Sequence, residues 1–329
     1  MSVDVRNEFG PLEEVIVGIP LSPDDRVFEW QPGMDEEFSW IKPHTFNWLK
    51  ENSGVPWKDA DPELFAKINE QVANFADVLT SAGVTVRRPD RLPAGDHTYI
   101  NIGTEQVWPR DVWCTAGDIV AVSSLRMPWK RKQQFSMLPF YTDLMAADGC
   151  RLVSTPQAST EILSHRSSEV EHQNVLLDGG DFFVVGDEIL LGQGHGSNAL
   201  GAKFAELVWH DEFTVRPLTL SAAALHLDCT IALLRPGLGI ICREWLVSDL
   251  PESIRDWEWI EATEQEAAWL GVNGVALDPE TYLMDPAHER LVAEVRARGH
   301  NVIEVPYDGP SYLGGSLRCS TQPVRRASL

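Results

Sequence analysis

The 329-residue sequence predicts an α/β fold of five similar units that close into a ring, a five-bladed α/β propeller. Runs of β-forming residues around Gly, Pro or Asp turns recur along the chain, and one polar residue opens each run. These opening residues are Asp111, Asp178, His226, Asn273 and Cys319. Their spacings are 178 − 111 = 67, 226 − 178 = 48, 273 − 226 = 47 and 319 − 273 = 46. Three nearly equal periods of this length indicate a structural repeat, and the N-terminal portion completes the five units.

Each unit is predicted to contain a strand pair, a helix and a further strand, in the order ββαβ. The strand pairs are expected in residues 106–123, 178–193, 225–244 and 274–285. Apolar residues at helical spacing predict helices in residues 62–82, 135–147, 198–209 and 286–298. Single strands are expected at residues 12–17, 84–86, 151–154, 213–217 and 301–306. Closure of such a ring brings the opening residue of every unit to one axial mouth.

Residues 1–329 are interpreted as a single catalytic domain with a long loop insertion at about residues 21–60. The insertion has little periodicity and several prolines, and it carries Trp30, Trp40, Trp48 and Trp57. Long irregular segments often serve as binding loops, and the tryptophans suggest that this one packs onto the body of the protein. The sequence leaves two interpretations of this segment open: a lid over a site, and a purely structural excursion.

Composition limits the partners and the compartment. The formal net charge of −22 repels phosphate backbones, so nucleic acid is not an expected partner. The N-terminus lacks the features of a signal peptide, and no segment approaches the roughly 20 apolar residues that span a bilayer. The five cysteines form an odd set without CxxC spacing, which argues against a zinc ribbon or a disulfide scaffold. We therefore expect a cytoplasmic protein that does not enter membranes.

Four short motifs carry candidate chemistry. They are Arg110-Asp111, Asp178-Gly179-Gly180-Asp181, His226-Leu227-Asp228, and Cys319 preceded by Gly314-Gly315. Each motif alone is weak, because a lone cysteine is usually a small core residue and an Asp-Gly-Gly-Asp stretch is usually a solvated turn. Together they supply a nucleophile, a general acid/base and several carboxylates. His226 and Asp228 are expected on one face of a strand, because side chains alternate along a strand.

Carboxylates beside a thiol suit a cationic substrate. Developing negative charge on a phosphate or acyl group would be repelled there, whereas a guanidinium presents N–H donors that carboxylates accept in bidentate pairs. The electron-poor central carbon of a guanidinium is a target for a thiolate. The pKa of a free cysteine is about 8.5, and a bound guanidinium or a protonated His226 would lower it.

The motifs PRD, D-G/A-G/A-D/N, HxD and Gly-Gly-x-x-x-Cys, in this order, resemble the guanidino-group-modifying enzymes of the pentein fold. The stretches NEFGPLEEVIVG (7–18), NALGAK (198–203), RPGL (235–238) and VRR (324–326) are similar to the amidinotransferases, above all the inosamine-phosphate type and with it the glycine type. The resemblance implies that Cys319 is the nucleophile, that His226 is the acid/base, and that Asp178 assists His226 and binds the guanidinium. It implies substrate contacts from Asp111 and Asp228. Further candidates for substrate binding are Arg110, Asp181, Asn273 and Arg243, the last as an anchor for a carboxylate.

The leading interpretation is an amidinotransferase that moves the amidino group of arginine to an amine through an amidino-cysteine, with release of ornithine. The alternative is a guanidino hydrolase or deiminase in which water discharges the same intermediate. GGSLRC replaces the GGGFHC of the transferases, and Thr321-Gln322-Pro323 leans towards the hydrolases. A non-enzymatic ribosome-binding pentein and a papain-like hydrolase fit less well. The expected partners are small molecules, a homodimer is compatible with the sequence, and no metal or organic cofactor is implied.

Overall fold

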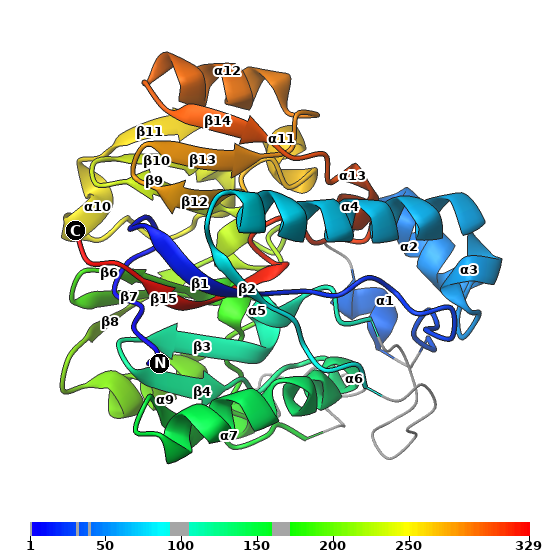
Figure 1. The fold of residues 1–329 in the computed structure, drawn as a ribbon, viewed down its shortest axis with the longest axis horizontal. Coiled ribbons are helices and arrows are strands. Elements are labelled where there is room, and N and C mark those ends of the chain that lie inside the picture. The colour runs from blue at the N-terminus through cyan, green and yellow to red at the C-terminus, as the bar shows by residue number, and fades with distance from the viewer. Residues whose placement is uncertain (1, 31–32, 39–40, 93–104, 160–171) are drawn as a thin grey trace.

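The computed structural model describes residues 2–30, 33–38, 41–92, 105–159 and 172–329, and these form five three-stranded sheets (Figure 1). One sheet contains β15, β1 and β2, and the others contain three consecutive strands each. The strands are β1 (Leu12–Val17), β2 (Thr85–Arg87), β3 (Trp113–Ala116), β4 (Ile119–Val122), β5 (Arg151–Ser154), β6 (Phe182–Val185), β7 (Glu188–Gln193), β8 (Thr214–Thr219), β9 (Ile231–Arg235), β10 (Leu238–Ile241), β11 (Glu258–Glu261), β12 (Val275–Asp278), β13 (Thr281–Met284), β14 (Asn301–Glu304) and β15 (Thr321–Arg326).

Every sheet has the same pairing. Its first two strands are antiparallel and its third strand is parallel to the middle one. A helix lies between the second and third strands of each unit in sequence: α4 (Pro62–Ser81), α7 (Leu138–Ala146), α9 (Ala199–Trp209), α10 (Glu252–Arg255) and α12 (Glu289–Ala297). The predicted ββαβ repeat and the five-unit α/β propeller are therefore confirmed.

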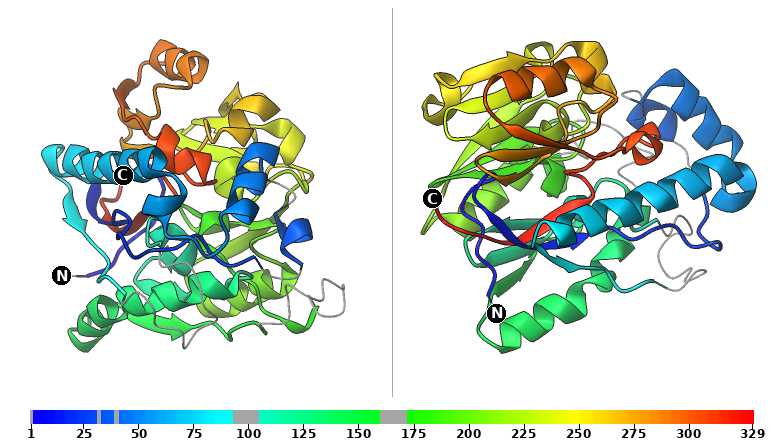
Figure 2. Two further views of the ribbon diagram at one scale, coloured as in Figure 1. Left: turned by 90° about the vertical axis from the view of Figure 1, so that its right-hand side faces the viewer. Right: turned by 45° about the horizontal axis from the view of Figure 1, so that its top comes forward.

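The two ends of the chain close the ring. β15 pairs antiparallel with β1, with Leu12 opposite Arg326 and Val17 opposite Thr321. The two strands lie side by side between the β3–β5 and β12–β14 sheets, as both sets of views show (Figures 1 and 2). The C-terminal strand thus completes the first unit, and residues on either side of Cys319 are fixed by contacts with the N-terminus.

Local sequence signals explain the elements. Asp61 caps α4 by accepting the backbone N–H of Leu64 at 2.9 Å, and Pro62 occupies the first turn, where its missing donor costs nothing. The helix buries an apolar stripe that includes Val72 and Phe75, and it ends before Gly83, whose φ is +87°. The four-residue strands β3 and β4 are buried at every position and, apart from Thr115, apolar, because both faces pack against neighbouring layers.

The entrances to the strand pairs differ from the prediction. A single helical turn precedes the first strand in three units: α5 (Pro109–Val112), η3 (Gly179–Asp181) and η4 (Leu227–Cys229). The strands therefore begin later than expected, at Trp113, Phe182 and Ile231. His226 and Asp228 consequently do not alternate on a strand, and the turn between them sends their side chains to different partners.

The 21–60 segment is not one long loop. Its described residues contain the short helices α1 (Met34–Glu37), α2 (Pro43–Glu51) and α3 (Trp57–Ala60). As expected from its tryptophans, the segment packs onto the body of the protein: the ring of Trp48 meets the ring of Tyr312 edge-on at 6.4 Å between centroids, and Thr45 donates to the carbonyl of Tyr312 at 2.9 Å. Trp40 lies outside the described residues.

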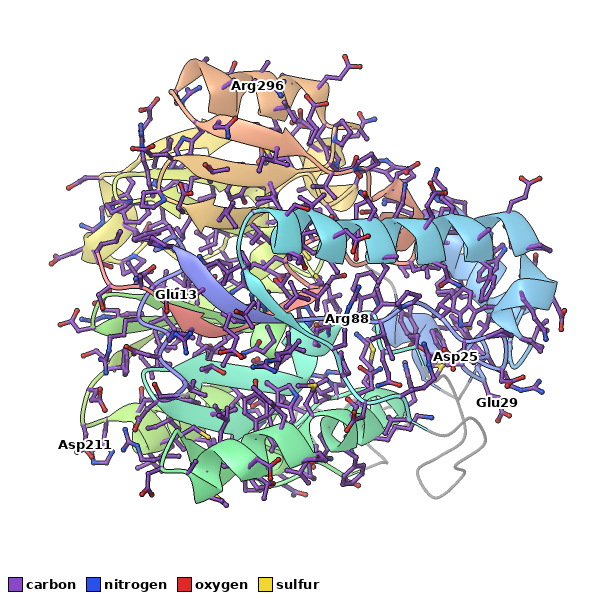
Figure 3. All side chains as sticks on the ribbon, viewed as in Figure 1. Glu13, Asp25, Glu29, Arg88, Asp211 and Arg296 are labelled. Atoms are coloured by element: carbon purple, nitrogen blue, oxygen red, sulfur yellow. The ribbon has the colours of Figure 1, made fainter. Side chains whose placement is uncertain are left out.

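The chain after β2 contacts this segment and the residues just before it. Arg91 pairs with the buried carboxylate of Asp25 at 3.4 Å, and Arg88 donates to the carbonyl of Gly18. Figure 3 labels Arg88 and Asp25. Within the described ranges, no helix combines the length and the apolar character that crossing a membrane requires.

The ring closure provides a stability prediction. Val324 on β15 is fully buried, so Val324→Ala removes packed methyl groups and should lower the free energy of unfolding by about 1–3 kcal/mol. Leu329 lies just beyond β15 and is 66% exposed, so Leu329→Ala should leave that free energy almost unchanged. Urea unfolding of the three proteins measures the difference. Equal losses in both variants would contradict the closing role of β15.

Candidate active site

Three of the opening residues line a single pocket. Asp111, His226 and Cys319 contribute to its wall, together with Gly314 and Gly315. Much of the remaining wall is aromatic, from Phe28, Phe38, Trp57, Trp108 and Trp129. The first three of these belong to the 21–60 segment, which therefore forms part of the pocket.

The imidazole of His226 contacts the carboxylate of Asp178. Its Nε2 lies 3.2 Å from Oδ2 of Asp178, and both side chains are more than nine-tenths buried. The other oxygen of Asp178 accepts the backbone N–H of Gly180 at 2.9 Å, and the backbone N–H of Asp178 donates to the hydroxyl of Ser197 at 2.9 Å. These two hydrogen bonds hold the carboxylate of Asp178 in the orientation in which it contacts the imidazole.

Glycines make room for these groups. A Cβ at Gly180 would lie 2.4 Å from Nδ1 of His226, and one at Gly196 would lie 2.6 Å from its Cδ2. A Cβ at Gly315 would lie 2.5 Å from the Trp108 ring. These positions need glycine because a ring packs directly against the backbone.

The carboxylates keep His226 protonated. Burial alone would lower the pKa of His226, but Asp178, Asp181 and Asp111 outweigh it and raise the pKa to about 10. Asp181 is itself buried, which raises its pKa to about 7. One oxygen of Asp181 accepts the backbone N–H of Leu227 at 2.9 Å, so this residue positions the turn that carries His226.

Cys319 is a buried thiol. Its Sγ lies 3.6 Å from Oδ2 of Asp228, and its backbone N–H donates to Oδ1 of Asn273 at 3.2 Å. Burial and the nearby charges of Asp228 and Asp111 raise the pKa of the thiol well above its usual value. The thiol therefore needs an added cation before it ionises near neutral pH.

Arg318, next to the nucleophile candidate, joins three units. Its guanidinium pairs with Asp228 at 3.1 Å and with Glu8 at 3.2 Å, and it donates to the carbonyl of Phe182 at 2.8 Å. It also lies 3.7 Å above the ring of Phe183. Asp228 is occupied by this pair, so its free capacity towards a substrate is smaller than the sequence suggested.

Not all predicted substrate contacts reach the pocket. Arg110 belongs to a separate small hollow inside the ring, and Asn273 bonds the backbone of Cys319 and the carbonyl of Asp228. Arg243 lies on the surface, where its half-exposed guanidinium pairs with Glu261 at 2.7 Å. The geometry does not support Arg243 as a carboxylate anchor, because the short η5 turn (Arg243–Trp245) directs it away from the pocket.

Two charged residues of the pocket escaped the sequence analysis. Lys130 pairs with Asp111, and Glu105 lies in the same wall. Lys130 belongs to the basic run Lys130-Arg131-Lys132, which is typical of a solvated surface. Its neighbours Pro128 and Trp129 were the only local signal that this stretch turns inward.

Asp111, Asp178 and His226 also form a cluster whose potential ligand atoms lie within 4.8 Å of one another. The cluster is a poor metal site, because Lys130 already pairs with Asp111 and the high pKa of His226 leaves its imidazole protonated. A planar cation with N–H donors suits these carboxylates better.

Comparison with known proteins agrees with this chemistry. No family model matches the chain. Inosamine-phosphate amidinotransferase 1 of Streptomyces griseus is 26% identical over 99% of this chain and 97% of its own length. The mitochondrial glycine amidinotransferase of Xenopus tropicalis is 21% identical over 97% of this chain and 82% of its own length.

Solved structures show the same fold. An amidinotransferase of the saxitoxin biosynthetic pathway of Microseira wollei superposes with a TM-score of 0.80 at 22% identity, over 99% of this chain and 98% of its own. DDAH from Pseudomonas aeruginosa superposes with a TM-score of 0.65 at 16% identity, over 95% and 99%. The fold is that of the pentein proteins. Along nearly its whole length the chain is a homologue of the inosamine-phosphate and glycine amidinotransferases, as its motifs predicted.

Glu105 provides a pH-dependence prediction. Burial raises the pKa of Glu105 to about 7, from an ordinary value of 4.5. Between these values the folded protein holds a proton that the unfolded chain has lost, so stability falls as pH rises from about 4.5 to 7. Glu105→Gln should remove a fall on the order of 3 kcal/mol. Urea unfolding at pH 5 and pH 8 measures it, with the exposed Glu70→Gln as control, and an unchanged pH slope in Glu105→Gln would refute the assignment.

Proposed function

We propose that this protein is an amidinotransferase that moves the amidino group of L-arginine to an amine through an S-amidino intermediate on Cys319. One observation carries the proposal: the thiol of Cys319 and an imidazolium held by Asp178 line the same aromatic pocket. The homology to amidinotransferases supports the same reaction.

In the first half-reaction, the guanidinium lies against Asp111 and Asp178, sharing Asp111 with Lys130. Its positive charge favours ionisation of the thiol, and Sγ of Cys319 bonds to the guanidinium carbon. His226 donates a proton to the bridging nitrogen as its bond to that carbon breaks, and neutral ornithine side-chain amine leaves. The thiol proton passes to solvent, so the products are ornithine, a cationic S-amidino-cysteine and a neutral imidazole at His226.

In the second half-reaction, the acceptor amine takes the place of ornithine. Neutral imidazole of His226 removes a proton from the amine as its nitrogen bonds to the amidino carbon. The carbon–sulfur bond breaks, Cys319 leaves as a thiolate and takes a proton from solvent, and His226 is again an imidazolium. The aromatic wall favours an amine over water in this step, because a dry pocket slows hydrolysis of the intermediate.

The decisive experiment incubates the protein with arginine alone and then with added glycine as a small amine. We expect an adduct of one amidino group on Cys319 without the amine, and ornithine turnover only with it. Cys319→Ser should form neither, whereas Cys242→Ala, a buried cysteine outside the pocket, should retain both. Citrulline and ammonia from arginine alone, or urea and ornithine, would instead establish the hydrolase alternative.

A second experiment separates binding from proton transfer. Asp178→Asn leaves guanidinium donors unpaired, which should weaken arginine binding by about 2–4 kcal/mol and also slow turnover. His226→Asn removes the proton donor and should lower kcat by about 10²–10⁴ with little loss of binding. Calorimetric titration with arginine and single-turnover kinetics give the two readouts. A wild-type rate in His226→Asn would remove His226 from the mechanism.

We place the activity in the cytoplasm, since all five cysteines are unpaired thiols, which fits a reducing compartment.

A further inference from the structure

A second hollow inside the ring shares no lining residue with the active-site pocket. Its charged walls are Arg110, Arg318, Arg326 and Glu8, and Tyr282 contributes its ring. All five side chains are at least nine-tenths buried. The space is small, with room for about one particle of the size of a water molecule.

The charges around this hollow do not balance. Arg110, Arg318 and Arg326 bring three positive charges, and Glu8 with Asp228 brings two negative ones, so 3 − 2 = 1 positive charge remains. Both carboxylates pair with Arg318. Within the described part of the chain, neither Arg110 nor Arg326 has a carboxylate within ion-pair distance.

The two other arginines are poorly satisfied. The hydrogen bonds of Arg110 are long, at 3.4 Å to the carbonyl of Arg318 and 3.4 Å to the hydroxyl of Thr321. Arg326 donates from Nη1 to the carbonyl of Gly10 at 2.7 Å, but its Nε has no partner among the described residues. Burial of a guanidinium whose hydrogen bonds are long or missing costs free energy unless a counter-ion binds beside it.

The polar groups of the hollow that make no hydrogen bond to a described residue are of one chemical kind. Nε of Arg326 and the hydroxyl of Tyr282 are both donors, both lie in the wall of the hollow, and both lack a hydrogen-bond partner among the described residues. Burial and the like charge of Arg318 lower the pKa of Arg110 to about 9 and that of Arg326 to about 10, against the opposing effect of Glu8. Donors around excess positive charge suit an anion.

We propose that this hollow binds one monatomic anion, in practice chloride, held by Arg326, Arg110 and Tyr282. The size of the space excludes sulfate and phosphate. The anion would join the closing strand β15, which carries Arg326, to α5 and β13. It would act as a structural ion of the ring, independent of the reaction proposed for the pocket.

The test uses the full-length protein in chloride-free sodium gluconate and follows thermal unfolding as sodium chloride replaces gluconate at constant ionic strength. We expect the melting temperature to rise by a few degrees and then saturate. Crystals grown with sodium bromide should show an anomalous peak within hydrogen-bond distance of Nε of Arg326 and the Tyr282 hydroxyl.

Two variants sharpen the test. Arg326→Gln should abolish the chloride dependence, and the volume-conserving Tyr282→Phe, which is safer for folding, should raise the half-saturating chloride concentration about tenfold. Equal melting temperatures in chloride and gluconate, with no anomalous peak, would overturn the proposal in favour of a buried water. A bromide peak without any effect in solution would mean an adventitious ion only, and would overturn it as well.

Discussion

The structure depends on the buried guanidinium of Arg318. It pairs with Glu8 from the N-terminal segment and with Asp228 from the β9–β11 unit, and it covers the ring of Phe183. A buried cation is tolerated only when its partners satisfy it, so these units must meet in one arrangement. Since Arg318 directly precedes Cys319, the interaction that holds the ring together also sets the position of the thiol.

The charges around the pocket explain why the thiol of Cys319 stays protonated until a substrate binds. Asp178, Asp181 and Asp111 raise the pKa of His226, whereas burial, Asp228 and Asp111 raise the pKa of Cys319. Asp111 therefore acts on both groups. The imidazole is therefore ready to donate a proton, while the thiol retains its own. In the reaction proposed above, a cationic substrate neutralises the carboxylates and so confines the reactivity of the thiol to the complex with that substrate.

Several features were predictable because their signals are local. Turn residues such as Gly186, with φ of +62°, mark the strand pairs, and Asn198 caps the predicted helix by accepting the N–H of Gly201. Short-range signals failed where a single helical turn opens a unit, since Pro109 and Gly179 lie among residues that also suit a strand. Lys130 and Arg243 show the same limit, because the neighbours Pro128 and Trp129 are weak evidence against the basic run around Lys130, and the neighbours of Arg243 do not show that it is exposed.

The sequence by itself determined the repeat, the order of the motifs and the class of chemistry, because spacing, turn residues and side-chain types are properties of the chain alone. Only the tertiary structure decided which of these groups meet. Asp178 contacts His226, whereas Asp228 pairs with Arg318. Lys130 pairs with Asp111, whereas Arg243 lies on the surface, away from the pocket. These choices depend on how five units pack around one axis, and contacts between residues more than forty positions apart leave no periodic trace in the sequence.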